Sequence, residues 1–271
     1  MTNRATNTSA VPAPLDDLER RQLPRHIAAI MDGNGRWATS RGMPRLLGHR
    51  EGAATVRKIV SECARLKLET LTLYSFSSEN WKRPKDEVAG LMELCCEFLV
   101  LERPMMLAEG IRFRRIGSRK ELPQHVLDEL DATEAATAHG TGLTLCLAMN
   151  YGSRTEIADA AREIATKVEQ GTLRAEDVSE HTIAKHLYTA GIPDPDLLIR
   201  TAGEFRVSNF LLWQISYAEI HVTDVLWPDF TPSDLHAAIR DFTRRERKFG
   251  ELGASVIDAK PSSSHRGATA R

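Results

Sequence analysis

The chain has 271 residues, of which 42 % are hydrophobic, and a formal net charge of −1 from 36 basic and 37 acidic residues. This length allows one large α/β domain or two small ones. The balanced charge provides no field for nucleic acid or an acidic membrane surface. No run of about 18 apolar residues is present that could span a bilayer.

The cysteines and the two ends of the chain indicate the setting of the fold. Cys63, Cys95, Cys96 and Cys146 lack Cys-x-x-Cys spacing, which favours buried thiols in a reducing cytoplasm. Residues 1–24 have no hydrophobic signal-peptide core and predict a flexible leader, and residues 251–271 predict a flexible tail. One folded domain is expected over residues 25–250, because no repeat or break in composition divides it.

Between the two ends, apolar runs of strand length alternate with stretches of helical period. Strands are expected near residues 27–31, 70–76, 111–116, 143–149, 196–200 and 218–223. Helices are expected near residues 49–66, 85–108, 123–138, 154–169, 179–188 and 232–249. This alternation is typical of an α/β domain with a mostly parallel sheet that is covered on both sides.

The first predicted strand ends in the sequence Asp32-Gly33-Asn34-Gly35-Arg36-Trp37. Ligands of such sheets gather at the carboxyl ends of the strands, and glycines there let backbone N–H groups approach a diphosphate. Asp32 can share in binding that anion only if a cation offsets the repulsion. The motif therefore predicts a divalent metal, most plausibly Mg²⁺.

The same residues formally satisfy the dinucleotide fingerprint G-x-G-x-x-G/A, from Gly33 to Ala38. A dinucleotide fold needs a long helix after the glycines and an acidic residue near the end of the second strand. Here Gly42 and Pro44 would end the helix after about two turns, and the strand at 71–76 ends without a carboxylate. A nucleotide-binding oxidoreductase and a purely structural glycine turn are the alternatives.

Two further strand ends carry polar residues, at 77–84 and at 200–209. Arginine suits bidentate phosphate recognition, and convergence on two diphosphates is expected for Arg36, Arg45, Arg83, Arg200 and Arg206. Taken singly, each arginine is more often solvated surface.

Four other side chains have both an ordinary and a functional interpretation. Trp37 and Trp81 fit either the core or the wall of an apolar pocket. His49 fits a helix cap or a ligand. Glu219 lies in an apolar neighbourhood and needs a partner, either an arginine or a metal-bound diphosphate.

Three blocks of the chain resemble the signature blocks of bacterial cis-prenyltransferases, and most closely those of the undecaprenyl diphosphate synthases. They are residues 26–38 (HIAAIMDGNGRWA), 74–84 (YSFSSENWKRP) and 208–214 (SNFLLWQ). The similarity covers about residues 25–250 in the family's order and spacing. It implies a six-stranded, largely parallel sheet in a homodimer that condenses isopentenyl diphosphate repeatedly onto an allylic starter, farnesyl diphosphate. The implied product is undecaprenyl diphosphate, the precursor of the lipid carrier for cell-wall polysaccharides.

The resemblance also implies roles for individual residues. Asp32 would hold Mg²⁺ and be catalytic, Glu219 would be the second metal-associated carboxylate, and Asn80 would be the other catalytic residue. The starter would be bound by Gly33, Asn34, Gly35, Arg36, Trp37, Arg45 and His49. Isopentenyl diphosphate would be bound by Arg200, Arg206, Val207 and Ser208. A loop that closes over the substrates would include Ser77, Ser78, Glu79, Asn80, Trp81 and Arg83.

In the implied reaction, the bond between C1 of the allylic substrate and its diphosphate breaks, and C1 is joined to the double bond of isopentenyl diphosphate. Loss of a proton from C2 of the isopentenyl unit then forms the new cis double bond. The proton acceptor stays open, because Asn80 is a neutral amide and can only position or relay. Asp32 and a diphosphate oxygen are the other candidates. The alternatives are a synthase that makes a shorter or different chain and a non-catalytic subunit of the same fold. Transient contact with a membrane would release the lipid product.

The chain departs from the family pattern at two positions. Ala202 stands where the family has glycine, and it would strain the loop if φ were positive there. Lys248 replaces an arginine and loses the bidentate fork.

The helix at 85–108 carries an apolar stripe of Leu91, Leu94, Cys95 and Phe98, which any helix covering a sheet needs. The resemblance favours a tunnel here in which the product grows, with Ser75 at its mouth and Leu143 at its far end.

Overall fold

The computed structural model describes residues 15–245. At its centre lies a six-stranded sheet in the order β3-β4-β2-β1-β5-β6, and every pairing in it is parallel. The strands are β1 (His26–Ile30), β2 (Thr70–Ser77), β3 (Arg112–Ile116), β4 (Thr144–Tyr151), β5 (Leu197–Arg200) and β6 (Glu219–Val222). All six predicted strands are therefore present, and the predicted fold class is confirmed.

The helices lie close to the predicted ranges. They are α1 (Asn34–Thr39), α2 (Arg45–Arg65), α3 (Lys85–Ala108), α4 (Gln124–Thr137), α5 (Ser153–Glu169), α6 (Glu180–His186) and α7 (Pro232–Arg244). α2 begins directly after its N-cap residue Pro44, four residues earlier than predicted; a proline is tolerated at the start of a helix but costs a backbone hydrogen bond in its interior. The predicted end of the last helix, at 249, lies outside the described residues.

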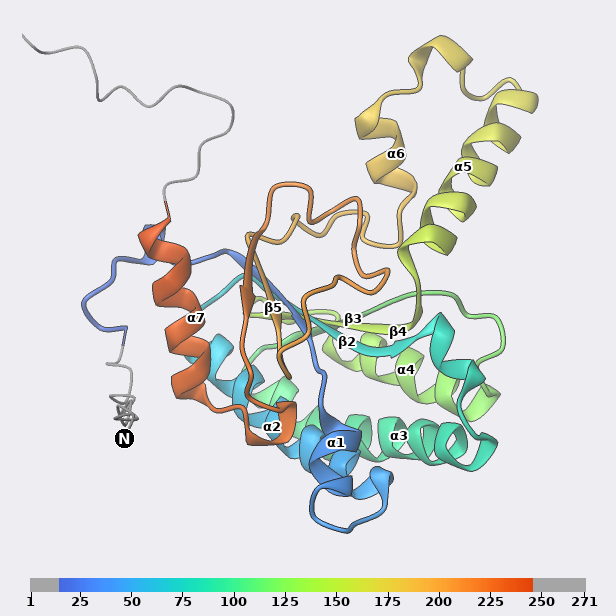
Figure 1. Cartoon of the computed structure of the whole chain (residues 1–271). Helices are drawn as coiled ribbons and strands as arrows, with labels where there is room; N and C mark the ends of the chain where they lie inside the picture. The colour runs from blue at the N-terminus through green and yellow to red at the C-terminus, as the bar shows by residue number, and fades with distance from the viewer. Residues whose placement is uncertain (1–14, 246–271) are drawn as a thin grey trace, which may run out of the picture.

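The two faces of the sheet are covered unequally. Figure 1 shows α2, α3 and α4 together beneath the sheet, whereas α5 and α6 project from the body of the domain. Ile27 and Ala29 of β1 point into the large core on the helical face. Ala28 and Ile30 point to the other face, into a small cluster that includes Phe210 of the long β5–β6 connection. The second face is thus closed largely by a loop.

The folded part begins before residue 25, contrary to the predicted leader. Leu15 is only 4 % exposed and belongs to the large core, and Asp17 forms an ion pair with Arg240 of α7 at 2.6 Å. Residues 15–24 therefore pack onto the domain. The rest of the predicted leader, the predicted tail and Lys248 lie outside the described residues.

The sheet brings the three candidate loops to one edge. Ile30, the last residue of β1, pairs with Tyr74 of β2 on one side and with Arg200, the last residue of β5, on the other. Because the strands are parallel, the residues that follow β1, β2 and β5 leave the sheet on the same side. The loops beginning at Asp32, Ser78 and Thr201 are therefore neighbours.

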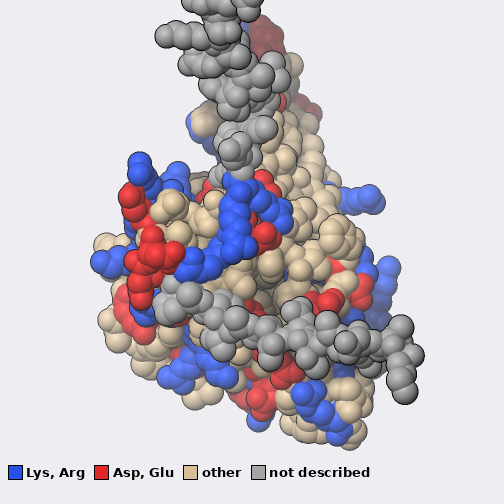
Figure 2. Space-filling model, turned by 60° about the vertical axis from the view of Figure 1, so that its left-hand side comes forward, with Lys and Arg blue, Asp and Glu red and all other residues tan. Residues whose placement is uncertain are grey.

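The described surface mixes charges of both signs. On the face shown in Figure 2, the basic and acidic side chains are interleaved rather than gathered into a region of one sign. Within residues 15–245, no helix is both long enough and apolar enough to cross a bilayer.

Candidate active site

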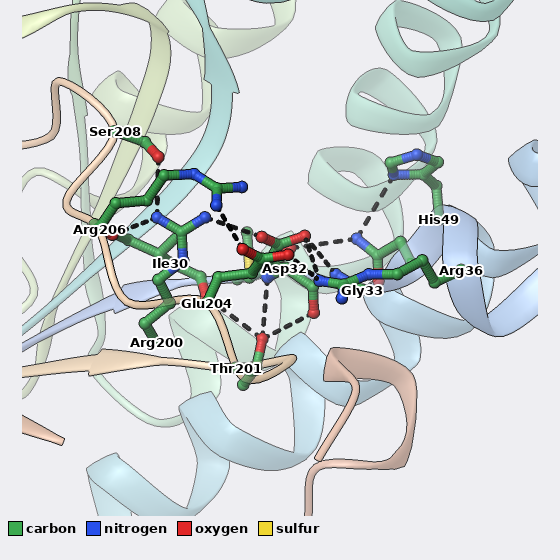
Figure 3. A network of polar contacts seen from close by, with 12 residues as sticks. Ile30, Asp32, Gly33, Arg36, His49, Arg200, Thr201, Glu204, Arg206 and Ser208 are labelled. Carbon is green, nitrogen blue, oxygen red and sulfur yellow. Dashed lines mark hydrogen bonds and ion pairs between the residues drawn. The ribbon is translucent and has the colours of Figure 1, made fainter. Parts of the chain in front are cut away.

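Asp32 lies directly after β1 and is held from several sides (Figure 3). Its Oδ2 accepts a hydrogen bond from Arg200 Nη2 at 2.9 Å, and its Oδ1 accepts one from the Gly33 N–H at 2.7 Å. The Arg36 guanidinium lies 3.5 Å from Oδ1. The side chain still keeps 30 % of its surface exposed, so one carboxylate is fixed in place and remains open to a ligand.

Thr201 fixes the backbone of Asp32. Its Oγ1 accepts a hydrogen bond from the Asp32 N–H at 2.9 Å and donates to the Asp32 carbonyl at 2.7 Å. Thr201 is fully buried. Sequence reasoning did not select it, because a single threonine after a strand carries no distinctive pattern.

The glycines after Asp32 shape the start of α1. Gly33 has a φ of +105°, which side chains rarely adopt, and it precedes the first helical residue. A Cβ at Gly35 would lie 2.6 Å from the Arg45 guanidinium. The absence of side chains therefore lets Arg45 of α2 lie against the first turn of α1, where the backbone N–H groups also point.

Four of the predicted arginines meet beside Asp32. A hollow of about 250 Å³ is lined by Arg36, Arg45, Arg83 and Arg206 together with Asp32, the residues from Gly33 to Gly35, His49 and Glu204. The structure thus gathers most of the predicted starter-binding residues around one cationic space. Guanidinium groups and backbone N–H groups in such an arrangement suit a diphosphate.

Glu87, in the first turn of α3, is the main site residue that sequence reasoning missed. Its carboxylate lies 3.2 Å from Arg45 Nε, 2.9 Å from Arg83 Nη1 and 3.9 Å from His49 Nε2. Burial raises the pKa of Glu87, but the hydrogen bonds from Arg45 and Arg83 outweigh burial and lower it overall. An acidic residue at a helix start is common, so its sequence position alone did not mark it.

His49 is neutral in this setting. Burial, with the nearby Arg83 charge, lowers its pKa to about 4. Its Nδ1 lies 3.4 Å from Asn34 Nδ2, while its buried Nε2 makes no hydrogen bond to the described residues. A neutral ring with a free nitrogen can serve as a hydrogen-bond partner for an anion.

Arg200, Arg206 and Ser208 also come together, on the β5 side of Asp32. Arg200 is only 4 % exposed, and its Nη1 donates to Ser208 Oγ at 2.8 Å and to the Arg206 carbonyl. Glu204 pairs with Arg206 and also lies 3.3 Å from Arg36. The two predicted diphosphate clusters are therefore adjacent, with Glu204 between them.

Ala202 adopts the strained conformation that its position suggested. Its φ is +70°, its N–H donates to the Val225 carbonyl at 2.8 Å, and the residue is buried. A left-handed φ costs an L-residue about 1–2 kcal/mol, whereas glycine adopts it freely.

Replacing Ala202 with glycine is therefore expected to raise the free energy of unfolding by about 0.5–1 kcal/mol and Tm by about 1–3 °C. Ala54→Gly, at an exposed position inside α2, is the matched control and should lower stability by about 1 kcal/mol. Thermal unfolding of both variants checks the pair, and a lower Tm for Ala202→Gly would contradict the strain.

The loop after β2 is ordered by its own polar side chains. Asn80 Oδ1 accepts a hydrogen bond from the Ser77 N–H at 3.1 Å, and Ser78 Oγ donates to Glu79 at 3.3 Å. A hollow of about 570 Å³ is lined on this side by Ser77, Glu79, Asn80 and Arg83, and on the opposite side by Asp32, Arg206 and Ser208.

Several predicted site residues lie elsewhere. Trp81 packs edge-on against Phe76 and donates to Asn150 Oδ1 at 2.8 Å, beside the large core. Trp37 donates to Asp229 Oδ1 at 2.7 Å and stacks under Arg41. Val207 packs against the small core cluster. None of these three is among the described residues that line the hollows.

Glu219 is not brought to Asp32 within the chain. It is the first residue of β6 and pairs with Leu197, three residues before Arg200, which places it about 10 Å along the sheet from the carboxyl end. Its carboxylate accepts a hydrogen bond from Arg245 at 2.9 Å. Asp32 and Glu219 thus lie toward opposite ends of the strands.

An apolar cavity continues from the polar hollow into the helical face. It is narrow, about 80 Å³, and Met31, Asn34, His49, Ser75 and Leu91 line both spaces. Its deeper wall is made by Leu94, Cys95 and Phe98 of α3 with Leu147 and Met149 of β4. Leu143 lies before β4 and is not in this wall.

The described residues hold no cluster of three or more His, Cys, Asp or Glu side chains suited to a metal. Mg²⁺ is commonly held by one or two carboxylates together with substrate phosphates. Asp32, a single half-open carboxylate facing a cationic hollow, fits that mode of binding rather than a permanent metal site.

Comparison with known proteins identifies the relatives of this chain. Residues 30–250 match the prenyltransferase family described as undecaprenyl diphosphate synthase. The isoprenyl transferase of Geobacter sulfurreducens is 50 % identical over 235 residues, which is 87 % of this chain and 96 % of the relative. That of Geobacillus kaustophilus is 48 % identical over 93 % of this chain and 98 % of its own length.

Solved structures agree with the sequence relatives. The lavandulyl diphosphate synthase of Lavandula x intermedia, in complex with dimethylallyl diphosphate, superposes with a TM-score of 0.83 at 39 % identity, over 85 % of this chain and all of that one. A probable undecaprenyl diphosphate synthase from Campylobacter jejuni gives 0.70 at 33 % identity, over 84 % and 99 % of the two chains. The chain belongs to the undecaprenyl diphosphate synthase family of cis-prenyltransferases.

Proposed function

We propose that the protein condenses isopentenyl diphosphate repeatedly onto farnesyl diphosphate, with Mg²⁺, to give a long cis-polyprenyl diphosphate, undecaprenyl diphosphate. The observation that carries this proposal is the continuity of two unlike spaces. The polar hollow at the strand ends shares Asp32, Arg83 and Arg206 with the cationic hollow beside α1. It continues past Ser75 and Leu91 into an apolar cavity beneath the sheet. Such a pair suits a molecule with a diphosphate head and a growing hydrocarbon tail.

The starter diphosphate binds the hollow beside α1 in this scheme. Arg36 and Arg45 would neutralise its charge, and the backbone N–H groups at the start of α1 would bind its oxygens. These contacts strengthen as the C1–O bond breaks and negative charge gathers on the leaving group. Mg²⁺ bound by Asp32 and the diphosphate would supply further charge stabilisation.

Isopentenyl diphosphate binds the adjacent cluster. Arg206 and Ser208, which line the polar hollow, would hold its diphosphate so that its double bond faces C1 of the starter. The buried Arg200 would add its charge from behind Ser208 Oγ. Asn80 lines the same hollow and orients the reacting groups, and a proton leaves C2 toward a diphosphate oxygen or Asp32. The loop from Ser77 to Arg83 excludes water from the allylic cation.

A homodimer would give Glu219 access to a metal. Within one chain this carboxylate lies toward the amino ends of the strands, away from Asp32. A second copy is therefore needed if Glu219 is to act as the second metal-associated carboxylate. We place the reaction in the cytoplasm, with transient membrane contact for release of the lipid product.

The proposal is tested by incubating the protein with farnesyl diphosphate, labelled isopentenyl diphosphate and Mg²⁺, and separating the extracted lipids by chromatography. A ladder that ends in one long product is expected, and chelation of the metal should abolish it. Labelled lipid that is absent at every metal concentration would contradict the proposal.

Ser75→Leu is expected to shorten the product. Ser75 lines both the polar hollow and the apolar cavity, and added carbon atoms in a packed channel cost about 1–3 kcal/mol. Elongation past this point should slow by about 10- to 100-fold. Ser40→Leu, at an exposed position after α1, is the control and should keep the wild-type length. Identical products from the two variants would place chain growth elsewhere.

A further inference from the structure

Asn209 connects three segments that are far apart in the sequence. Its Nδ2 donates a hydrogen bond to Glu79 Oε1 at 2.8 Å, in the loop after β2. Its Oδ1 accepts one from the Arg154 N–H at 2.9 Å, and its carbonyl accepts one from the Ser153 N–H at 2.9 Å, both at the start of α5. A single side chain thus ties the β2 loop to the β5–β6 connection and anchors both on a helix.

The backbone around Asn209 is held in an uncommon conformation. Ser208, Asn209 and Leu211 have φ values of +47°, +60° and +48°. Such residues are strained and persist only where surrounding contacts enforce them, which occurs most often at functional sites. Here the contacts are Arg200 to Ser208 Oγ at 2.8 Å, the Tyr74 hydroxyl to the Ser208 carbonyl at 3.3 Å, and the Leu212 N–H to Ser153 Oγ at 3.0 Å.

The Asn209–Glu79 hydrogen bond crosses the mouth of the polar hollow. Glu79, Asn80 and Arg83 line the hollow from one loop, and Arg206, Ser208 and Asn209 line it from the other. Asn80 follows Glu79 directly in the chain. A change in the position of Asn209 is therefore transmitted to the loop that carries Asn80 and Arg83.

We propose that Asn209 is a positioning residue that couples the two substrate loops, so that the β2 loop is ordered only when the segment at 208–211 holds its strained form. Asn209 binds no substrate in this role. It acts on the loop after β2 through Glu79, and on the β5–β6 connection through Ser153 and Arg154. The kinetic part of the proposal rests on the proposed function, whereas the structural part does not.

Three variants isolate the Glu79 contact. Asn209→Asp keeps an oxygen that accepts from the Arg154 N–H, and it tolerates a positive φ. It places a second carboxylate beside that of Glu79, so the hydrogen bond between them is replaced by repulsion. Glu79→Gln keeps an oxygen that accepts from Asn209. The double variant restores a hydrogen bond with the donor and acceptor exchanged, and it carries the same net charge as the wild type.

The first measurement is hydrogen exchange of the peptide covering residues 77–83 in the substrate-free protein. Asn209→Asp should lower the protection of this loop about tenfold, and Glu79→Gln and the double variant should exchange like the wild type. Wild-type protection in Asn209→Asp, or no recovery in the double variant, would overturn the coupling whether or not the protein makes polyprenyl diphosphates.

The second measurement is steady-state kinetics with each substrate varied in turn. Asn209→Asp should lower kcat/KM for both substrates about tenfold, and the double variant should recover most of that loss. Asn209→Gly removes the side chain and adopts φ +60° without strain. In the hydrogen-exchange measurement it should lower the protection of residues 77–83 as much as Asn209→Asp does. A loss confined to isopentenyl diphosphate that the double variant does not repair would mean that Asn209 only shapes its own loop.

Discussion

Asp32→Ala is expected to leave a folded protein whose turnover has fallen by 10²- to 10⁴-fold. Asp32 is the only carboxylate at the end of β1 and faces the cationic hollow while two arginines hold it in place. In the proposed mechanism Asp32 binds Mg²⁺ beside the leaving diphosphate, and this variant removes that ligand. The expected loss corresponds to about 3–5 kcal/mol of transition-state stabilisation. Turnover at saturating substrates and a range of Mg²⁺ concentrations measures the effect.

Two further variants distinguish a loss of catalysis from a loss of folding. Asp32→Asn keeps an oxygen for the Gly33 N–H and should be nearly as inactive. Asp17→Ala removes a carboxylate that pairs with Arg240 far from the hollow, and it should keep wild-type turnover. Circular dichroism spectra and Tm values check that all three variants are folded. More than half of wild-type turnover in Asp32→Ala would contradict the proposed role of the carboxylate.

Arg200→Ala and Arg45→Ala are expected to affect different substrates. Arg200 belongs with Arg206 and Ser208, and Arg45 belongs with Glu87 beside α1. A charge-assisted contact to phosphate contributes about 1.5–3 kcal/mol. Arg200→Ala should therefore raise KM for isopentenyl diphosphate about 10- to 100-fold, and Arg45→Ala should do the same for the allylic substrate.

Two further variants serve as controls for Arg45→Ala and Arg200→Ala. Arg65→Ala removes an arginine that pairs with Glu62 on α2 and should leave both KM values unchanged. Arg206→Ala tests the isopentenyl cluster without removing a buried side chain, because Arg206 is 60 % exposed. Equal effects of Arg45→Ala and Arg200→Ala on both substrates would mean that Glu204 joins the two clusters into one anion site.

The centre of the sheet could be predicted because its strands are short, largely apolar runs with turn or helix signals beside them. β1 reads His-Ile-Ala-Ala-Ile, and every one of its five residues is buried. After His26 the run has no polar residue, which is typical of a strand that is covered on both faces. The rule that ligands gather at carboxyl strand ends then located Asp32, Arg200 and the β2 loop at one edge.

The residues that were missed act through contacts between distant segments. Glu87 gathers Arg45 and Arg83, and Asn209 reaches Glu79 across 130 positions. Each is an ordinary polar residue in its local sequence, so only the folded chain shows its partners. Leu15 was missed for a related reason, because a single leucine among polar residues gives no periodic signal although it is buried in the core.

The tryptophans and Glu219 show the limit of carrying a role over by resemblance. Trp81 satisfies its ring nitrogen with Asn150 beside the core, and Trp37 satisfies its own with Asp229. Both ring systems therefore have structural partners in this chain. Glu219 has Arg245, and its strand position keeps it from Asp32 within one chain.

The configuration of the newly formed double bonds tests the central claim most directly. The protein is incubated with farnesyl diphosphate, isopentenyl diphosphate labelled with ¹³C at C2, and Mg²⁺, and the purified product is examined by NMR. The proposed mechanism predicts that every unit added to the starter has a cis double bond and that the starter's own double bonds stay trans. New units that are all trans, or a starter recovered unchanged under conditions where the protein is folded, would contradict it.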